Sequence, residues 1–497
     1  MSEGVSAPCL VQTRYGAVRG VGSAAVNRFL GIPYAAAPVG ERRFAPPQPP
    51  RHWTDPRDAT RAGANSPQII RAFPGLDVTP LVGHGWQRGD DFLTVNIWTP
   101  SDGRTRCPVL IFIHGGAFIG GCSDARVHAG TEFARDGIVY AAINYRLGVE
   151  GFLPMAGAPT NLGLRDQIAA IEWVKANIDA FGGNPGNITV AGESAGAMSL
   201  ASLLASPLAH GLIRRAIVQS GHGSMVRPLE VAERVTRLVA RHLNVTPDAA
   251  GFKQRSFEDC SAAVAAISRP DIGIDLRDRL GRDPAYGLAR FLPVFGDDVL
   301  PRPPLDALAG AERSKTQLLI GTNRDEMNLY FVTTGVKELS TAASAGKMLG
   351  LSHPQARDVL ASYGMGKPHM RPGAVLTEAM NDLVFRLPAR QFAAAFPGAS
   401  HLYEFGWRSP ACGGELGACH GLELPFVFDT LETCTGPEGI AGTDPPQALA
   451  RDIHRIWVDF VSDGTLPWAR YQASTRQSFS LETQTAAPDG DMPAAEF

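Results

Sequence analysis

A glycine-flanked pentapeptide, Gly192-Glu-Ser-Ala-Gly196, lies between an apolar segment and a segment with helical spacing. Residues 187–191 predict a short buried strand, and residues 195–205 predict the helix that follows it. A strand that passes directly into a helix around a serine must turn sharply, and small residues on both sides make that turn possible. The sequence therefore predicts a tight strand-to-helix turn that presents Ser194 at the carboxyl end of a sheet.

Other parts of the chain extend this strand-and-helix pattern. Apolar runs that are typical of strands buried on both faces occur at residues 109–113 and 138–143, and residues 162–180 have helical spacing. Further strands are expected at residues 94–98, 215–219, 317–320 and 401–405. Such alternation predicts an α/β protein, with a mostly parallel central sheet and helices on both faces. The first hundred residues are rich in Gly, Pro and Arg and predict an opening dominated by loops.

The length of 497 residues would suggest about three domains at roughly 150 residues each. Large α/β proteins often form one continuous body instead, so we expect a single domain over residues 1–497. Less regular stretches near residues 60–90, 225–285 and 335–400 are expected to be inserted segments that cover one face of it.

Charge and composition exclude several classes of protein. The chain has 46 Lys and Arg against 49 Asp and Glu, without a basic stripe, which argues against a nucleic-acid partner. It has no apolar run of the roughly 18 residues that a membrane span needs, and its start lacks the pattern of a signal peptide. Seven cysteines are too sparse for a disulfide framework. We therefore expect a cytoplasmic protein with reduced thiols, without membrane attachment.

Ser194 at such a turn is a candidate nucleophile, and a serine hydroxyl needs a base that is itself oriented by an acid. In hydrolases with this turn, the acid precedes the histidine along the chain. Asp325 and Glu326 follow the strand at residues 317–320, and the residues alone leave both open as the acid. Of the five histidines that follow, His420 lies in a glycine-rich loop after a strand, which makes it the candidate base.

The segment His114-Gly-Gly-Ala-Phe118 follows a predicted buried strand. Its backbone N–H groups could stabilise the oxyanion of a tetrahedral intermediate, together with the N–H of Ala195. The alternative is a simple turn, because two glycines after a strand are also typical of turns.

Many ordered segments of this chain resemble the type-B carboxylesterase family, which includes cholinesterases and bacterial p-nitrobenzyl esterases. They are Phe29-Leu-Gly-Ile-Pro-Tyr34, Asp90-Asp-Phe-Leu-Thr-Val-Asn-Ile-Trp98, Asn144-Tyr-Arg-Leu-Gly148, Phe181-Gly-Gly-Asn-Pro185, Gln219-Ser-Gly221, Gly321-Thr-Asn-Arg-Asp-Glu326 and His420-Gly-Leu-Glu-Leu-Pro-Phe-Val-Phe428. The resemblance implies an α/β-hydrolase fold with inserted helical segments over the active site.

Residue by residue, the resemblance implies a set of roles. The catalytic set would be Ser194, Glu326 and His420, with oxyanion donors at Gly116, Ala117 and Ala195, supporting residues Glu193 and Gly115, and pocket residues Phe118, Trp86 and Phe331. The chain departs from eukaryotic members at Phe92, where they have a cysteine, so their loop disulfide is not expected. Gly287 and Ala289 stand near the positions of the bulky acyl-pocket aromatic residues of cholinesterases, which argues against a dedicated choline-ester enzyme.

The expected function is a serine carboxylesterase that forms an acyl-enzyme without a cofactor or a metal. Its substrates would be small esters with short to medium acyl groups, with bulky or aromatic esters also possible, and it would be a monomer or a weak homo-oligomer. A carbamate or amide hydrolase with the same residues is one alternative. A catalytically inactive binding module is another, although the intact Ser, Glu and His set argues against it.

Overall fold

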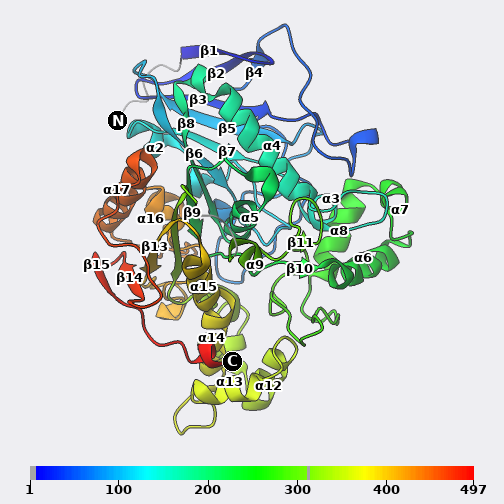
Figure 1. Cartoon of the computed structure of the whole chain (residues 1–497), viewed down its shortest axis with the longest axis vertical. Coiled ribbons are helices and arrows are strands. Elements are labelled where there is room, and N and C mark those ends of the chain that lie inside the picture. Colours follow the sequence, from blue (N-terminus) through cyan, green and yellow to red (C-terminus); the bar gives the residue numbers. More distant parts are fainter. Residues whose placement is uncertain (1–6, 310–313) are drawn as a thin grey trace.

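A long twisted sheet forms the centre of the molecule (Figure 1). The structure is a computed structural model that describes residues 7–309 and 314–497. Within these residues the main sheet has 13 strands in the order β1-β2-β3-β5-β7-β6-β8-β9-β12-β13-β14-β15, with β4 paired to β2. The strands are β1 (Ala7–Thr13), β2 (Gly16–Gly22), β3 (Val26–Pro33), β4 (Arg57–Asp58), β5 (Thr94–Pro100), β6 (Cys107–Ile113), β7 (Val139–Ile143), β8 (Gly183–Glu193), β9 (Arg215–Gln219), β12 (Gln317–Asn323), β13 (Ala399–Phe405), β14 (Gln477–Ser480) and β15 (Thr485–Pro488). A separate parallel pair joins β10 (Arg227–Pro228) and β11 (Val294–Phe295).

The middle of the sheet is parallel, as the sequence predicts. Strands β7, β6, β8, β9, β12 and β13 pair with one another in the same direction. Their carboxyl ends therefore meet at one edge, and the loops that follow β6, β8 and β12 lie next to one another there. In open α/β sheets, this edge is where ligands bind.

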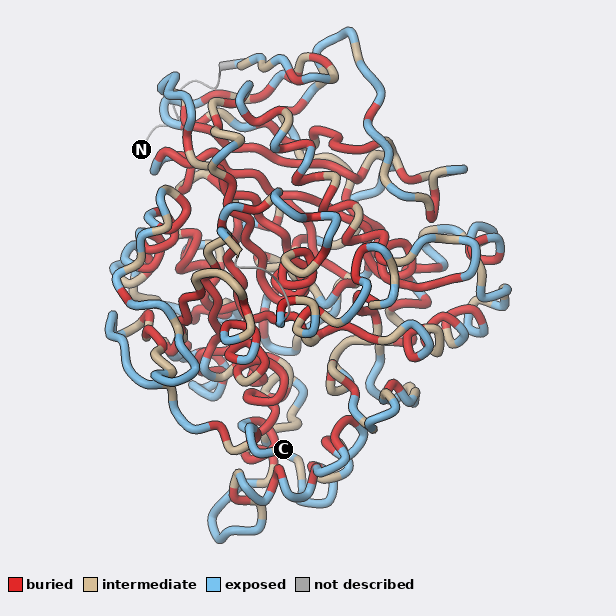
Figure 2. Tube along the Cα trace, in the orientation of Figure 1, coloured by how far each residue is buried: buried red, intermediate tan, exposed pale blue. Residues whose placement is uncertain are grey.

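Helices cover both faces of the sheet, and β6 shows why. Val109, Ile111 and Ile113 belong to one hydrophobic cluster, which also contains residues of α4 (Leu162–Asn177) and α5 (Ala195–Leu204). Leu110 and Phe112 belong to a second cluster, with residues of α17 (Gln447–Asp463). Successive side chains of a strand point to opposite faces, so the apolar run places one core on each side. Figure 2 shows the buried residues concentrated along this centre.

The loop-rich opening that the sequence predicts is present over residues 34–93, which are mostly irregular, but three strands precede it that the sequence did not predict. Strands β1, β2 and β3 pair antiparallel over residues 7–33, and β3 pairs antiparallel with β5. A glycine in a strand is a weak strand former, but Gly20 has a packing reason, since a Cβ there would lie 2.5 Å from the Phe29 ring. Glycine allows β2 and β3 to approach, and that reason is not visible in the composition.

The three stretches expected to be inserted differ in structure. Residues 60–90 are mostly irregular, with α1 (Thr79–Val82) as their helix. The second contains α6 (Leu229–Leu243), α7 (Ala249–Lys253) and α8 (Phe257–Ile267). The third contains α11 (Val336–Leu339), α12 (Ala342–Gly350), α13 (Ala356–Ser362), α14 (Pro372–Asn381), the π-helix η5 (Asp382–Arg386) and α15 (Leu387–Ala395). In Figure 1, α12 and α13 lie at the lower end of the molecule, away from β1 and β2.

The remaining α-helices are short. They are α2 (Thr131–Arg135), α3 (Gly148–Phe152), α9 (Pro304–Leu308), α10 (Asn328–Phe331) and α16 (Leu424–Val427). Across the part of the chain that the structure describes, none of the helices combines the length and the apolar character needed to cross a membrane.

Candidate active site

The predicted turn is present between β8 and α5. Ser194 has φ 54° and ψ −122°, a backbone conformation that side-chain-bearing residues rarely adopt. A Cβ at Gly192 would lie 2.5 Å from the carbonyl carbon of Gly196, and one at Gly196 would lie 2.0 Å from the Ile113 carbonyl oxygen. Both glycines are therefore required by close approach, and the turn lifts the serine above the carboxyl edge of the sheet.

A hydrogen-bonded chain connects Ser194, His420 and Glu326. The Ser194 Oγ lies 2.8 Å from His420 Nε2, and His420 Nδ1 lies 2.6 Å from Glu326 Oε2. Because a carboxylate accepts at Nδ1, that nitrogen carries the proton, and in the neutral imidazole Nε2 is left to accept from the serine hydroxyl. The arrangement is that of a serine nucleophile with its base and orienting acid.

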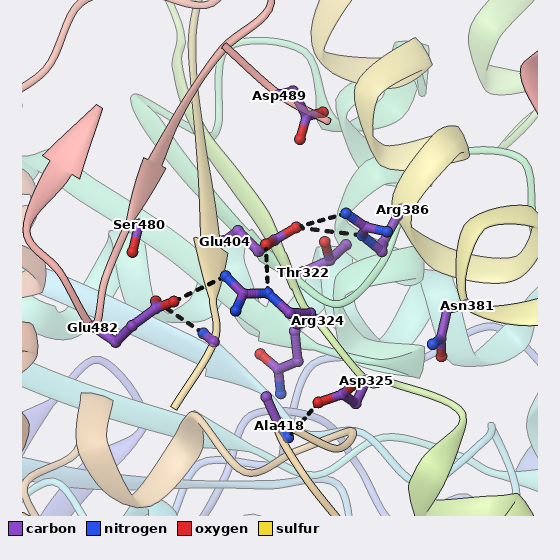
Figure 3. A network of polar contacts seen from close by, with 12 residues as sticks. Thr322, Arg324, Asp325, Asn381, Arg386, Glu404, Ala418, Ser480, Glu482 and Asp489 are labelled. Carbon is purple, nitrogen blue, oxygen red and sulfur yellow. Dashed lines mark hydrogen bonds and ion pairs between the residues drawn. The ribbon is translucent and has the colours of Figure 1, made fainter. Parts of the chain in front are cut away.

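The structure distinguishes the two neighbouring acids. Glu326 is fully buried, and its second oxygen accepts the backbone N–H of Asn323 at 2.8 Å. Asp325 accepts instead from Arg408 Nη1 and from the backbone N–H of Ala418, and Figure 3 shows the second of these bonds. Only the glutamate is therefore placed to orient His420.

Two further buried carboxylates surround this histidine. Glu193 Oε1 lies 3.2 Å from His420 Nε2, and Glu423 accepts from Asn323 Nδ2 at 2.7 Å and from Gln219 Nε2 at 3.2 Å. Burial raises the pKa of both carboxyl groups. Burial alone would lower the pKa of His420, but the charges of Glu193 and Glu326 outweigh it and raise the pKa above its ordinary value. The cluster therefore favours an imidazolium ion.

The sequence patterns predict no role for Glu423, Gln219 or Asn323. Each lies within a segment that carries the family resemblance, and this placement is the feature of the sequence that could have indicated a role in the site. Their side chains converge only in three dimensions, because they come from the His420 loop, the end of β9 and the end of β12.

The glycine-rich loop after β6 lies beside the serine. A Cβ at Gly115 would lie 2.4 Å from Glu193 Oε2 and 3.0 Å from Ser194 Cβ, so this loop contacts the turn directly. Gly116 has φ 108°. Among the described residues, the backbone N–H groups of Gly116, Ala117 and Ala195 have no recorded acceptor. Three free donors next to the serine are suited to bind an oxyanion.

Ala117 and Phe118 hold the loop in an unusual conformation. Their φ angles are 55° and 63°, in the left-handed region that non-glycine residues seldom enter. The Phe118 carbonyl accepts the N–H of Gly148 at 2.7 Å, and its ring packs 4.7 Å from that of Phe152. These contacts offset the backbone strain and keep the donors in place.

The predicted pocket residues differ in their surroundings. Phe118 and Phe331 are buried in the core, and Trp86 packs against Phe257 and beneath Arg88. A pocket role for these three stays a prediction. Sequence reasoning missed Tyr330 and Phe385, whose ring centroids lie 5.7 and 4.9 Å from that of His420.

Metal binding has no evident site in this region. Over residues 7–309 and 314–497, His, Cys, Asp and Glu side chains form no group of three or more that could hold a metal ion.

A serine turn at the carboxyl edge of a parallel sheet, followed in chain order by a glutamate and a histidine, defines a serine hydrolase of the α/β-hydrolase class. Residues 7–491 match the model of the carboxylesterase family. The chain belongs to this family and is a carboxylic-ester hydrolase.

Its relatives cover nearly its whole length. The para-nitrobenzyl esterase of Bacillus subtilis is 34% identical over 492 residues, which cover 96% of this chain and 95% of the relative. The phenmedipham hydrolase of Pseudarthrobacter oxydans is 33% identical over 450 residues, which cover 88% of this chain and 86% of the relative. A solved structure of a Geobacillus stearothermophilus carboxylesterase superposes with a TM-score of 0.81 at 32% identity, covering 97% of this chain and 98% of that one.

Proposed function

We propose that Ser194, His420 and Glu326 hydrolyse carboxylic esters through an acyl-enzyme. The observation that carries this proposal is the unbroken chain from Ser194 Oγ through His420 to Glu326, with distances of 2.8 and 2.6 Å. In the first step, Ser194 Oγ attacks the ester carbonyl carbon while His420 Nε2 takes its proton.

The tetrahedral intermediate places a negative charge on the former carbonyl oxygen. The N–H groups of Gly116, Ala117 and Ala195 would bind that oxygen, and each such donor contributes roughly 10²–10³ in rate. Glu326 stabilises the imidazolium on the other side of the ring. His420 then returns its proton to the leaving alcohol, and the acyl group remains on Ser194.

Deacylation repeats the sequence with water. His420 takes a proton from a water molecule, whose oxygen attacks the acyl carbon and forms a second oxyanion in the same site. Collapse of this intermediate releases the carboxylic acid, and the proton on His420 returns to Ser194 Oγ. No cofactor takes part in these steps. His420 ends the cycle in the protonation state in which it began.

Neutral esters of short to medium acyl groups are the proposed substrates, with bulky or aromatic esters included. The relation to a para-nitrobenzyl esterase supports an aromatic alcohol group. Carbamates are the second candidate, supported by the relation to a phenmedipham hydrolase. A carbamate would use the same residues, with a carbamoyl group on Ser194.

The experiment that tests this choice compares kcat/KM on p-nitrophenyl acetate, on a matched p-nitrophenyl carbamate and on the matched anilide. We expect the ester to be fastest by a wide margin. A carbamate faster than the ester would support the second candidate instead.

We also propose that the three inserted segments act as a cap over this edge of the sheet within a single domain, as a monomer or a weak homo-oligomer. A cytoplasmic location is supported by the seven cysteines, all of which are free thiols.

A further inference from the structure

The loops that carry Glu326 and His420 are hydrogen-bonded to each other directly. The Asn323 side-chain amide donates to the Cys419 carbonyl at 2.7 Å, and the backbone N–H of His420 donates to the Glu326 carbonyl at 3.3 Å. The position of the histidine backbone therefore depends on the loop after β12.

Asp325 makes two hydrogen bonds to the main chain of one residue on the histidine loop. Its backbone N–H donates to the Ala418 carbonyl at 2.9 Å, and its Oδ2 accepts the backbone N–H of Ala418 at 2.9 Å (Figure 3). One residue thus satisfies both main-chain polar groups of Ala418, two positions before His420. The same Oδ2 also accepts from Arg408 Nη1 at 2.6 Å.

Gly417 on the histidine loop leaves room for the Asp325 side chain, because it has no Cβ. Its φ of +60° lies in the left-handed region, and a Cβ there would lie 2.4 Å from Asp325 Oδ2. A side chain at 417 would therefore push the aspartate away from Ala418. The two loops fit each other through an acid on one side and a missing Cβ on the other.

The neighbouring Arg324 holds the same loop from the opposite direction. Its guanidinium donates to Glu404 at 3.1 Å and to Glu482 at 2.9 Å, on β13 and just after β14 (Figure 3). Arg324 thus anchors the loop after β12 to the sheet. Asp325 in the same loop binds the histidine loop.

We propose that Asp325 is a positioning residue, which acts through the Ala418 main chain to fix His420 relative to Glu326. The inference rests on the proposed function, since it concerns the same site. The hydrogen bond from His420 Nδ1 to Glu326 is 2.6 Å long, and small displacements of such groups can reduce rates by up to about 10²-fold.

Substitution at Asp325 gives the first test. Asp325→Ala should lower kcat roughly tenfold and change KM by less than about twofold, because the serine and the oxyanion donors stay in place. Asp325→Asn keeps an oxygen that accepts from Ala418 and should restore most of the rate. Arg408→Met removes only the ion pair and is the matched control, with kcat unchanged. Equal losses in Asp325→Ala and Arg408→Met, or full activity in Asp325→Ala, would overturn the proposal.

Gly417→Ala disturbs the same contact from the other loop. If Asp325→Ala and Gly417→Ala both break the contact between Asp325 and Ala418, each should lose roughly tenfold in kcat. The double variant should then also lose roughly tenfold, whereas independent sites would give a loss of roughly 100-fold. Multiplicative losses would contradict a shared contact. Rates are normalised to sites titrated with a fluorophosphonate, so that misfolded protein does not count.

A spectroscopic readout separates positioning from general damage. The proton between His420 Nδ1 and Glu326 should give a low-field ¹H resonance, which Asp325→Ala should shift upfield and Asp325→Asn should leave in place. An unmoved resonance with a lost rate would refute the proposed route. If Ser194→Ala were as active as the wild type, the proposed function itself would fail; an inactive Ser194→Ala beside a fully active Asp325→Ala would remove only the positioning role.

Discussion

Two adjacent acids in this chain have different surroundings, and the difference has a measurable consequence. Glu326→Gln keeps the shape of the side chain but removes the charge that stabilises the imidazolium, so we expect kcat to fall by about 10³–10⁴. Asp325→Asn, which keeps an acceptor for Ala418, should lose less than about tenfold. Steady-state rates on p-nitrophenyl acetate measure both. The reverse ranking would mean that the aspartate orients His420.

The carboxylates around His420 determine the pH dependence. They raise the pKa of His420, and a base must be neutral to accept the serine proton, so activity is lost as pH falls through this raised value. The acid limb of kcat/KM should therefore lie above the value of about 6.5 for an unperturbed histidine.

Glu193→Gln checks the cause of that shift. It removes one of the charges that raise the pKa of His420, so the acid limb should move to lower pH, while the charges of Glu326 and Glu423 still raise that pKa. Initial rates between about pH 5 and pH 9 give both midpoints. A wild-type midpoint below that of the variant would contradict this assignment.

Whether the sequence predicts a residue of the site depends on how far along the chain the residues that it contacts lie. Ser194 and His420 could be predicted because a local pattern surrounds each of them. The choice between Asp325 and Glu326 could not be made from residues alone, because it depends on which side chain points at a histidine far along the chain. The buried carboxylate of Glu423 was not predicted for the same reason, because its partners Asn323 and Gln219 lie far away along the chain.

At the scale of elements, the tight turn after β8 makes a specific demand on Gly196. A Cβ there would lie 2.0 Å from the Ile113 carbonyl oxygen, so Gly196→Ala should separate β6 from α5, with a cost of about 3 kcal/mol or more. We expect a lower thermal midpoint and an inactive site.

The matched control is Gly346→Ala in α12, where a Cβ would meet nothing within 4 Å. Alanine is the better helix former by about 0.5–1 kcal/mol, so this variant should be as active as the wild type and slightly more stable. Differential scanning calorimetry measures both variants. A Gly196→Ala protein with wild-type midpoint and activity would show that the turn tolerates a side chain.

Sequence patterns predicted the central strands well but did not predict β1, β2 and β3. The buried strands β6 and β7 are continuous apolar runs, which the sequence shows directly, whereas β8 begins at Gly183, before the predicted residues 187–191. Strand β2 contains three glycines and an arginine, and its alternation of buried and exposed residues is visible only in the structure. Gly16 and Gly20 leave room for Trp53 and Phe29, and this close packing overrides strand propensity.

At the scale of the whole molecule, one sheet edge collects groups from distant parts of the chain. The turn at Ser194, the glycine-rich loop, the loop of Glu326 and the loop of His420 follow β8, β6, β12 and β13, and the parallel direction of these strands brings them together. The parallel sheet could be predicted from alternating strands and helices. The path of the inserted segments could not, because their helices pack by contacts that no short pattern encodes.

Labelling with a fluorophosphonate identifies the side chain that forms the covalent intermediate, and we expect it to be Ser194. Intact-mass and peptide mass spectrometry should show one adduct per chain, on Ser194, with loss of activity in proportion to labelling. Ser194→Ala should take no label and lose about 10⁴–10⁶ in kcat, with an unchanged thermal midpoint. An adduct on another residue, or a Ser194→Ala protein that keeps more than about a tenth of the activity, would mean that Ser194 is not the nucleophile.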